Sequence, residues 1–322
     1  MNILVTGGAG YIGSALVPLL LAEGNRVRVL DNLLHGGSSM LGVWSHPEFE
    51  FVRGDVCDQD TRRRALAGVD AVVHLAAIVG DPACSRKPDV ARSVNLEASF
   101  ALIEESQRSG IRRFIFASTC SNYGKMKDPN QYVDENSELS PVSLYAETKV
   151  AVEQTLLQIG LRENWSPTPL RFATIFGVSP RMRFDLTVNE FTMEMLTKKQ
   201  LMVYGEQFWR PYIHVRDAAR GIQLVLNSPA DKVGGNVFNV GSTDQNFTKQ
   251  QLVEMIHPQV PEAEVKYVRK QEDPRDYRVS FARITDQLGF GITRSVAEGI
   301  EEVARLVRSG IITDFSDERY RN

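Results

Sequence analysis

The sequence predicts an α/β fold, in which a doubly wound parallel sheet is joined by a smaller C-terminal α/β lobe. Apolar runs alternate with helical stretches through the first half of the chain, as in α/β proteins. Most of these runs are continuously apolar, which is typical of parallel strands covered on both faces. After residue 174 the alternation becomes less regular. We therefore expect a first domain at 1–174, rejoined by about 211–241, and a lobe formed by 175–210 and 242–322.

Each expected element follows from its local pattern of residues. In the first half, strands are expected at 3–6, 27–30, 50–53, 71–76, 114–118 and 169–172, and helices at 11–23, 58–67, 89–109 and 143–163. In the second half, strands are expected at 211–215, 237–240 and 265–268, and helices at 187–198, 216–227, from 249, and at 295–309. Pro18 conflicts with the first helix, because an interior proline removes an amide donor. The charged tail, residues 314–322, is expected to face solvent.

Bulk composition excludes several classes of protein. The 322 residues are 43% apolar and 24% charged, with a net charge of −3 and no basic block, so neither nucleic acid nor an anionic membrane is an expected partner. The three cysteines are widely spaced, which predicts neither a disulfide framework nor a metal site. The first apolar segment lacks the pattern of a signal peptide, and no apolar run is long enough to span a bilayer. The expected location is the cytoplasm.

The glycines near the N-terminus predict a dinucleotide site. Gly7, Gly10 and Gly13 lie between an apolar strand and an apolar helix, and Asp31 ends the next strand. This Rossmann-type arrangement lets a backbone turn tightly and approach a diphosphate, which the amides that open the helix can bind. A carboxylate at Asp31 accepts from a ribose 2′-hydroxyl and repels a 2′-phosphate. The expected cofactor is therefore NAD rather than NADP.

A second set of residues suggests acid–base chemistry. Tyr145 and Lys149 are four residues apart, which places them on one helical face. A nearby lysine favours the phenolate and is expected to lower the tyrosine pKa, making a base for a sugar hydroxyl. The alternative is an ordinary surface pair. The catalytic interpretation is favoured because the preceding strand ends at Thr119, and ligands bind at the carboxyl ends of such strands.

Together these motifs resemble a known family. The matching stretches are TGGAGYIG at 6–13, Asp31, GDV at 54–56, HLAA at 74–77, Asn95, STCSNYG at 118–124, YAETK at 145–149 and RPYIHVRD at 210–217. They follow the order found in extended short-chain dehydrogenases/reductases, and within these the chain is similar to the NAD-dependent nucleotide-sugar epimerase/dehydratase group. The resemblance covers essentially the whole chain.

The resemblance implies roles for individual residues. Tyr145 matches the catalytic base, Lys149 the lysine that binds the nicotinamide ribose, and Thr119 the hydroxyl that contacts the substrate. Expected cofactor contacts are Gly7, Gly10, Tyr11, Ile12, Gly13, Asp31, Asn32, Asp55, Val56, Leu75, Ala76, Ala77, Asn95, Tyr145 and Lys149. Expected contacts with a nucleotide-diphosphate sugar are Asp81, Thr119, Cys120, Ser121, Thr174, Arg181, Arg183, Asn189, Arg210 and Arg275. No metal is expected.

Simpler alternatives accompany several of these assignments. Asn95 alternatively caps a turn, His74 is a packed strand residue rather than an acid, and Arg216 is a solvated charge at a helix start. Asp81 is as compatible with a structural role in its loop as with a sugar contact.

Departures from the family pattern bear on the reaction. Family dehydratases carry an acidic pair, usually Asp-Glu or Ser-Glu, directly after the active-site threonine, where this chain has Cys120 and Ser121. The expected reaction is therefore 4-epimerisation by transient oxidation at C4, with 4,6-dehydration or another keto-sugar reaction as the alternative. A non-catalytic dinucleotide sensor is a more remote one. By resemblance, the helices at 89–109 and 143–163 would pair in a homodimer.

Overall fold

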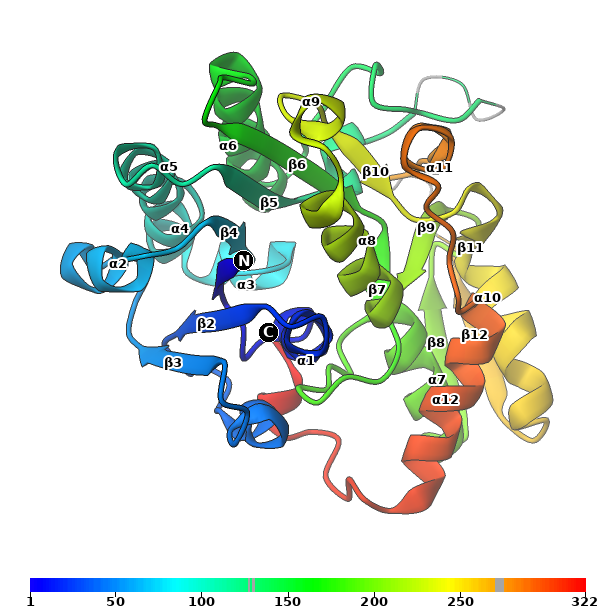
Figure 1. Cartoon of the computed structure of the whole chain (residues 1–322). Coiled ribbons are helices and arrows are strands. Elements are labelled where there is room, and N and C mark those ends of the chain that lie inside the picture. The colour runs from blue at the N-terminus through cyan, green and yellow to red at the C-terminus, as the bar shows by residue number, and fades with distance from the viewer. Residues whose placement is uncertain (127, 129–130, 270–274) are drawn as a thin grey trace.

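The computed structural model describes residues 1–126, 128, 131–269 and 275–322. Within these residues, seven parallel strands form the main sheet in the order β10-β6-β5-β4-β1-β2-β3 (Figure 1). Their bounds are β1 Asn2–Thr6, β2 Arg26–Asp31, β3 Phe49–Arg53, β4 Ala71–His74, β5 Arg113–Thr119, β6 Ser166–Phe172 and β10 Phe238–Val240. The strand order reverses between β1 and β4, and ligands bind at such a switch point. The predicted doubly wound α/β fold is confirmed.

Helices cover both faces of this sheet and bury its apolar strands. On one face lie α1 (Gly13–Ala22) and α8 (Val215–Asn227), which share a core cluster with β1, β2 and β6. On the other lie α2 (Gln59–Leu66), α5 (Ala98–Arg108) and α6 (Leu144–Ile159). Every residue of β4 and β6 is buried, which explains why the strands of the first half read as continuous apolar runs.

Two local features of the helices differ from expectation. The helix α1 continues through Pro18, whose side chain is exposed, so the irregularity stays out of the core. The helix expected at 89–109 is divided into α4 (Pro88–Arg92), a π-helical turn η2 (Ser93–Glu97) and α5. Such π turns occur frequently at functional sites.

A smaller part of the structure is built on two further sheets. The strands β7 (Thr174–Phe176), β9 (Trp209–His214) and β11 (Asn246–Thr248) form one, and β8 (Gln200–Tyr204) pairs with β12 (Glu264–Val268) in the other. Around them lie α7 (Thr187–Lys198), α10 (Lys249–Ile256) and α12 (Val296–Ser309), which share a third core cluster. The expected strand at 211–215 therefore belongs to this part, whereas α8 and β10 return to the main sheet.

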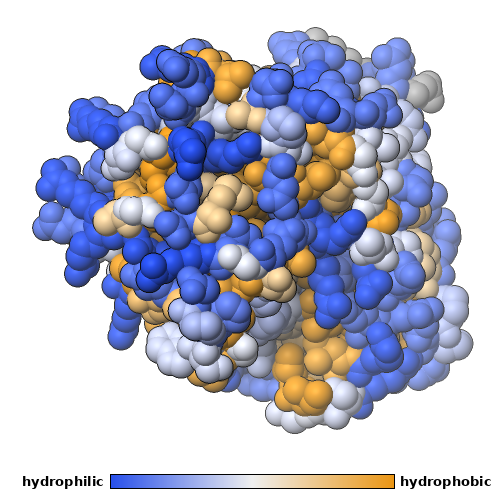
Figure 2. All heavy atoms as spheres, viewed as in Figure 1, coloured by the Kyte–Doolittle hydropathy of each residue, from blue (hydrophilic) through white to orange (hydrophobic). Residues whose placement is uncertain are grey.

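The remaining short elements connect these layers. They are η1 (Ser38–Val43), α3 (Asp81–Arg86), η3 (Cys120–Tyr123), α9 (Ala230–Val233), η4 (Thr243–Gln245), η5 (His257–Gln259), α11 (Ala282–Leu288) and η6 (Glu318–Tyr320). Hydrophilic residues cover much of the face in Figure 2, and hydrophobic residues are scattered between them. No helix in the described ranges is long and apolar enough to cross a bilayer.

Candidate active site

The glycine turn between β1 and α1 packs against the end of β4. Gly7 has φ +71°, and a Cβ added there would lie 2.7 Å from the amide nitrogen of Ala76. A Cβ on Gly13 would lie 2.5 Å from the Cα of Gly8. Leu75 donates its amide to the carbonyl of Thr6 at 3.1 Å, which brings the predicted residues 75 and 76 to the turn. A side chain at Gly7 or Gly13 would therefore displace backbone.

This turn fits the diphosphate of a dinucleotide. In the described structure the N-cap of α1, Ile12, makes no side-chain capping bond, and the first turn carries no acidic residue. Ser14 and Ala15 already donate their amides to the carbonyls of Gly10 and Ile12. Within the described residues, the amides of residues 11–13 are the donors left at this helix start, and the helix dipole adds partial positive charge. Together with the close backbone packing at Gly7 and Gly13, this arrangement is the one a dinucleotide requires.

Acidic and amide side chains lie at the ends of β2 and β3. Asp31 accepts from the amides of Ala9 at 3.0 Å and Leu33 at 2.8 Å, and burial raises the pKa of its carboxyl. Asn32 donates to Asp55 at 3.2 Å. The structure thus brings together the residues that were predicted to contact adenosine.

Two other predicted contacts instead join the glycine turn to the smaller part of the structure. The hydroxyl of Tyr11 donates to the carbonyl of Gly177 at 2.5 Å and accepts from Asn189 at 3.2 Å. Asn189 also donates to the carbonyl of Arg183 at 2.8 Å and accepts from the amide of Gly177 at 2.9 Å. These side chains hold the 177–189 loop, and their roles toward cofactor and substrate stay predictions.

Lys149 lies in the interior of the site. It is 3% exposed, and its Nζ lies 4.6 Å from the centroid of the Phe116 ring and 5.9 Å from that of Tyr145. Burial lowers the pKa of Lys149 to about 8. The described residues form no ion pair with this ammonium, and a lysine of this pKa is largely charged at neutral pH.

Tyr145 is half-buried one helical turn before Lys149. Burial raises the pKa of the Tyr145 phenol above its usual value, while the charge of Arg183 acts to lower it. The expectation of a lowered pKa is therefore wrong for this structure, because desolvation of the phenolate outweighs the nearby cations. Asp81 and Tyr277 also influence Tyr145, so all these groups share one site.

The last residue of β5 and the two residues after it make different contacts. Thr119 and Ser121 have their hydroxyl oxygens 2.6 Å apart, and Thr119 caps η3 by accepting from the amide of Ser121 at 3.1 Å. The thiol of Cys120 is buried and donates to the carbonyl of Arg171 at 3.3 Å. The expected substrate contact by Cys120 is untested, but its thiol is already engaged within the core.

A buried ion pair that the sequence did not reveal supports this turn. Arg171 binds Glu153 of α6, with Nη2 and Oε1 2.5 Å apart, and donates to the hydroxyl of Tyr123 at 2.8 Å. Glu153 also accepts from the hydroxyl of Ser118 at 2.6 Å. These bonds join β6, α6 and the turn that carries Thr119. The signal in the sequence that could have indicated this ion pair is the charged residue Arg171 within a strand that was expected to be buried.

Asp81 connects the start of α6 with Arg275. Its carboxylate accepts from the hydroxyl of Ser143 at 2.6 Å and from Arg275 at 2.7 Å. Ser143 in turn caps α6 by accepting from the amide of Ala146 at 3.3 Å. Both predicted substrate residues, Asp81 and Arg275, therefore lie beside the start of the helix that carries Tyr145.

Tyr277 is a site residue that the sequence did not single out. It is buried, the guanidinium of Arg210 lies 5.3 Å from its ring centroid, and it interacts with Ser121. The charges of the predicted residues Arg210 and Arg275 also act to lower the pKa of Tyr277. Thr174 lies in β7, opposite Tyr212 of β9, and is half-buried.

Arg183 and Arg181 follow different paths from the loop after β7. Arg183 forms a two-bond pair with Asp185, at 2.9 and 2.7 Å. Arg181 donates to the carbonyl of Arg321 and the side chain of Asn322, at 2.9 and 2.7 Å. The charge of Arg183 acts on the pKa of Tyr145, whereas Arg181 contacts residues 321 and 322.

Two buried polar residues are structural in this arrangement. Asn95, in the π turn, exchanges both amide bonds with the backbone of Ile78, at 2.8 and 2.9 Å, and so holds the loop after β4. His74 lies between the hydroxyls of Thr6 at 2.7 Å and Ser99 at 3.0 Å, and burial lowers its pKa to about 3. The prediction that His74 is a packed strand residue is confirmed.

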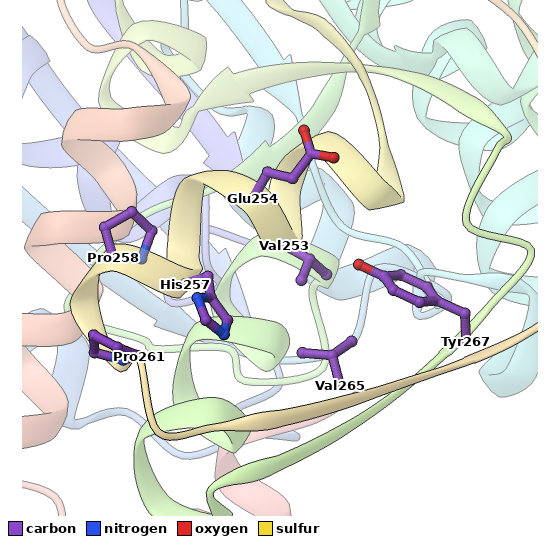
Figure 3. A pocket seen from close by; sticks show the side chains of 7 residues that line it. All are labelled: Val253, Glu254, His257, Pro258, Pro261, Val265 and Tyr267. Atoms are coloured by element: carbon purple, nitrogen blue, oxygen red, sulfur yellow. The ribbon is translucent and has the colours of Figure 1, made fainter.

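A surface cavity of about 560 Å³ lies elsewhere (Figure 3). It is lined by α10, the η5 turn and β12, with Val253, His257 and Tyr267 among its residues. None of the predicted site residues lines it. In the described part of the chain, no group of three or more His, Cys, Asp or Glu residues could hold a metal ion.

Comparisons with known proteins agree with this geometry. Residues 3–241 match the family described as the NAD dependent epimerase/dehydratase family. A dTDP-glucose 4,6-dehydratase of Streptomyces niveus is 32% identical, over 96% of this chain and 93% of that protein. A UDP-glucose 4-epimerase of Bacillus subtilis is 28% identical, over 92% and 94%. The crystal structure of the UDP-glucose 4-epimerase of Thermus thermophilus in complex with NAD superposes with a TM-score of 0.84, at 27% identity, covering 97% of this chain and 100% of that one.

Proposed function

The chain belongs to the NAD-dependent epimerase/dehydratase family, and from this premise we propose that it is a nucleotide-sugar 4-epimerase. The observation that carries the proposal is the turn after Thr119. A 4,6-dehydratase needs an acid and a base to remove water from the sugar, in addition to the group that oxidises C4. Here Cys120 is buried with its thiol on a main-chain carbonyl, and Ser121 is a hydroxyl without acidic character.

The chain's own residues supply proton transfer and positioning. The turn of Gly7, Gly10 and Gly13 would hold NAD, and bound NAD would supply a reversible hydride acceptor. Tyr145 takes the proton of the C4 hydroxyl as the hydride leaves C4, and returns it after the 4-keto sugar has turned its other face. Thr119 positions the same hydroxyl. The positive charge of the Lys149 ammonium favours the phenolate form of Tyr145 when the two side chains are close together. Substrate and product differ only in configuration, so no external redox partner is consumed.

Permanent positive charge suits the diphosphate of the substrate. The guanidinium of Arg210, in β9, lies 5.3 Å from the ring centroid of Tyr277. The charge of Arg275 acts on the pKa of Tyr277, and that of Arg183 acts on the pKa of Tyr145. A guanidinium offers a planar fork that matches phosphate oxygens. We assign these three arginines to the nucleotide-diphosphate group.

The relatives favour 4,6-dehydration as the second candidate. The Streptomyces niveus dehydratase is 32% identical to this chain, compared with 28% for the Bacillus subtilis epimerase. In that case Asp81, whose charge acts to raise the pKa of Tyr145, would be the candidate acid or base, although Ser143 and Arg275 already occupy its oxygens.

Incubation with a panel of UDP-, dTDP-, GDP- and CDP-sugars tests the proposal. A C4 epimer formed without net NADH supports it, whereas a 4-keto-6-deoxy product supports dehydration. Tyr145→Phe should lower kcat by about 10²–10⁴-fold, since it removes the proton-transfer group, yet retain NAD. Tyr267→Phe, in the distant surface cavity, is the matched control. Full activity of Tyr145→Phe would refute the assignment of the base, and no turnover of any sugar by the unaltered protein would favour a sensor.

We also propose that the protein is a homodimer through α4, α5 and α6. Val90 of α4 and Phe100 of α5 are 46% and 36% exposed, so a second subunit could cover them. Light scattering of the purified protein measures the mass directly. A monomeric mass would contradict the proposal.

A further inference from the structure

The tail segment, residues 314–322, leaves most of its charged residues exposed, as the sequence suggested, but it is also anchored to the protein by its two aromatic residues. Phe315 and Tyr320 pack edge-on against the buried ring of Phe184, with ring centroids 5.0 and 5.8 Å apart. The amide of Phe184 also donates to the carbonyl of Tyr320 at 2.9 Å. These contacts anchor the tail segment to the loop between β7 and α7.

Beyond Tyr320 the tail segment makes polar contacts with two separate parts of the structure. Arg181 donates to the carbonyl of Arg321 and to the side chain of Asn322. The amide of Asn322 donates to Asp185 at 3.1 Å. On the other side, Arg86 of α3 donates to the carbonyl of Asn322 at 3.1 Å. Residues 321 and 322 therefore bridge the loop after β7 and the helix after β4.

This bridge lies at the cofactor crevice. The amide of Arg181 donates to the hydroxyl of Ser14, in the first turn of α1, at 3.2 Å, and the charge of Arg181 acts on Asp31. Arg86 ends the helix that follows β4. Through Arg181 the tail segment is joined to the first turn of α1, which follows β1, and through Arg86 it is joined to the end of α3, which follows β4.

Arg181 carries a further sign of a ligand. Its side chain is 5% exposed, and its Nε is buried without a hydrogen-bond acceptor among the described residues. A buried guanidinium donor is costly to leave unpaired, and an anionic group is its natural acceptor. The diphosphate of a dinucleotide at the start of α1 supplies such a group.

We propose that the tail segment is a strap that closes the mouth of the cofactor crevice and slows the release of NAD. The docked residues would have to detach from Arg86 or from Arg181 before the dinucleotide could leave. The strap concerns retention of the cofactor, so it goes beyond the proposed sugar reaction and is independent of which sugar is used.

The rate of NAD release tests the strap without reference to turnover. The purified protein is loaded with NAD, passed through a desalting column, and sampled over time for retained NAD. Deleting residues 321–322 leaves the Phe315 and Tyr320 anchors in place and should speed release by at least about tenfold, equivalent to ~1.4 kcal/mol. Arg86→Ala breaks the other end and should act in the same direction. Arg319→Ala changes an exposed tail residue that, in the described part of the chain, pairs with Asp317 of the same segment, and it should leave release unchanged.

The outcomes separate the strap from its rivals. Unchanged release in both the deletion and Arg86→Ala would overturn the proposal, and melting temperatures show whether the deletion has lost its fold, in which case Arg86→Ala decides. Slower release or tighter NAD binding after deletion would also overturn it, since the tail segment would then compete with the cofactor. Absence of NAD binding by the unaltered protein would contradict the cofactor assignment and the strap together.

Discussion

The buried pair between Arg171 and Glu153 should dominate the response of the first domain to substitution. Their side chains are 4% and 0% exposed. When the guanidinium is removed, the donors that remain to Glu153 among the described residues are the neutral side chains of Ser118 and Asn122. Leaving one member of a buried pair uncompensated costs about 3–5 kcal/mol. We expect Arg171→Met to lower the free energy of unfolding by that amount.

A double-mutant cycle measures the interaction itself. Replacing the pair together, Arg171→Met with Glu153→Leu, removes both buried charges, so its effect should fall short of the sum of the single effects by at least about 1–3 kcal/mol. Urea unfolding followed by tryptophan fluorescence supplies the free energies. Arg108→Met, in an exposed pair with Glu104, is the control and should change stability by less than about 1 kcal/mol. Single effects below about 1 kcal/mol, or additive ones, would refute the reasoning.

Three further predictions concern the cofactor turn and the core. Gly7→Ala places a Cβ 2.7 Å from the amide of Ala76 and should abolish NAD binding in an equilibrium titration, whereas Gly42→Ala, with open space around it, should not. Asp31→Ala should reduce the preference for NAD over NADP by about tenfold or more, which is ~1.4 kcal/mol; unchanged discrimination would contradict its ribose role. The pKa of His74 is lowered from 6.5 to about 3 in the folded protein, so between these pH values the unfolded chain binds one proton more than the folded chain. The free energy of unfolding must therefore decrease as the pH is lowered below 6.5, by at most about 1.4 kcal/mol per pH unit. Urea unfolding at pH 7 and pH 5 should show this loss, and His74→Gln should reduce it.

The elements of the first domain could be predicted from sequence because their signals are local. Continuous apolar runs indicate parallel strands. The spacing of Gly7, Gly10 and Gly13 is set by a single backbone turn, which has no room for a side chain at Gly7 or Gly13. The fold class and the family follow from such patterns. The separate sheet that contains β9 could not be foreseen, because a six-residue strand carries no information about its partner.

Local patterns in the sequence were enough to predict three features: Tyr145 and Lys149 on one helical face, a doubly wound fold, and a glycine turn for a dinucleotide. Tertiary structure decided the rest, because the energy of a charged or polar group depends on neighbours that are distant in sequence. Burial raises the pKa of Tyr145, contrary to expectation, and Asp81 meets Arg275 across 194 positions. The composition of the tail segment predicted only that it faces solvent, whereas in the structure its Asn322 accepts a hydrogen bond from Arg86, 236 positions away.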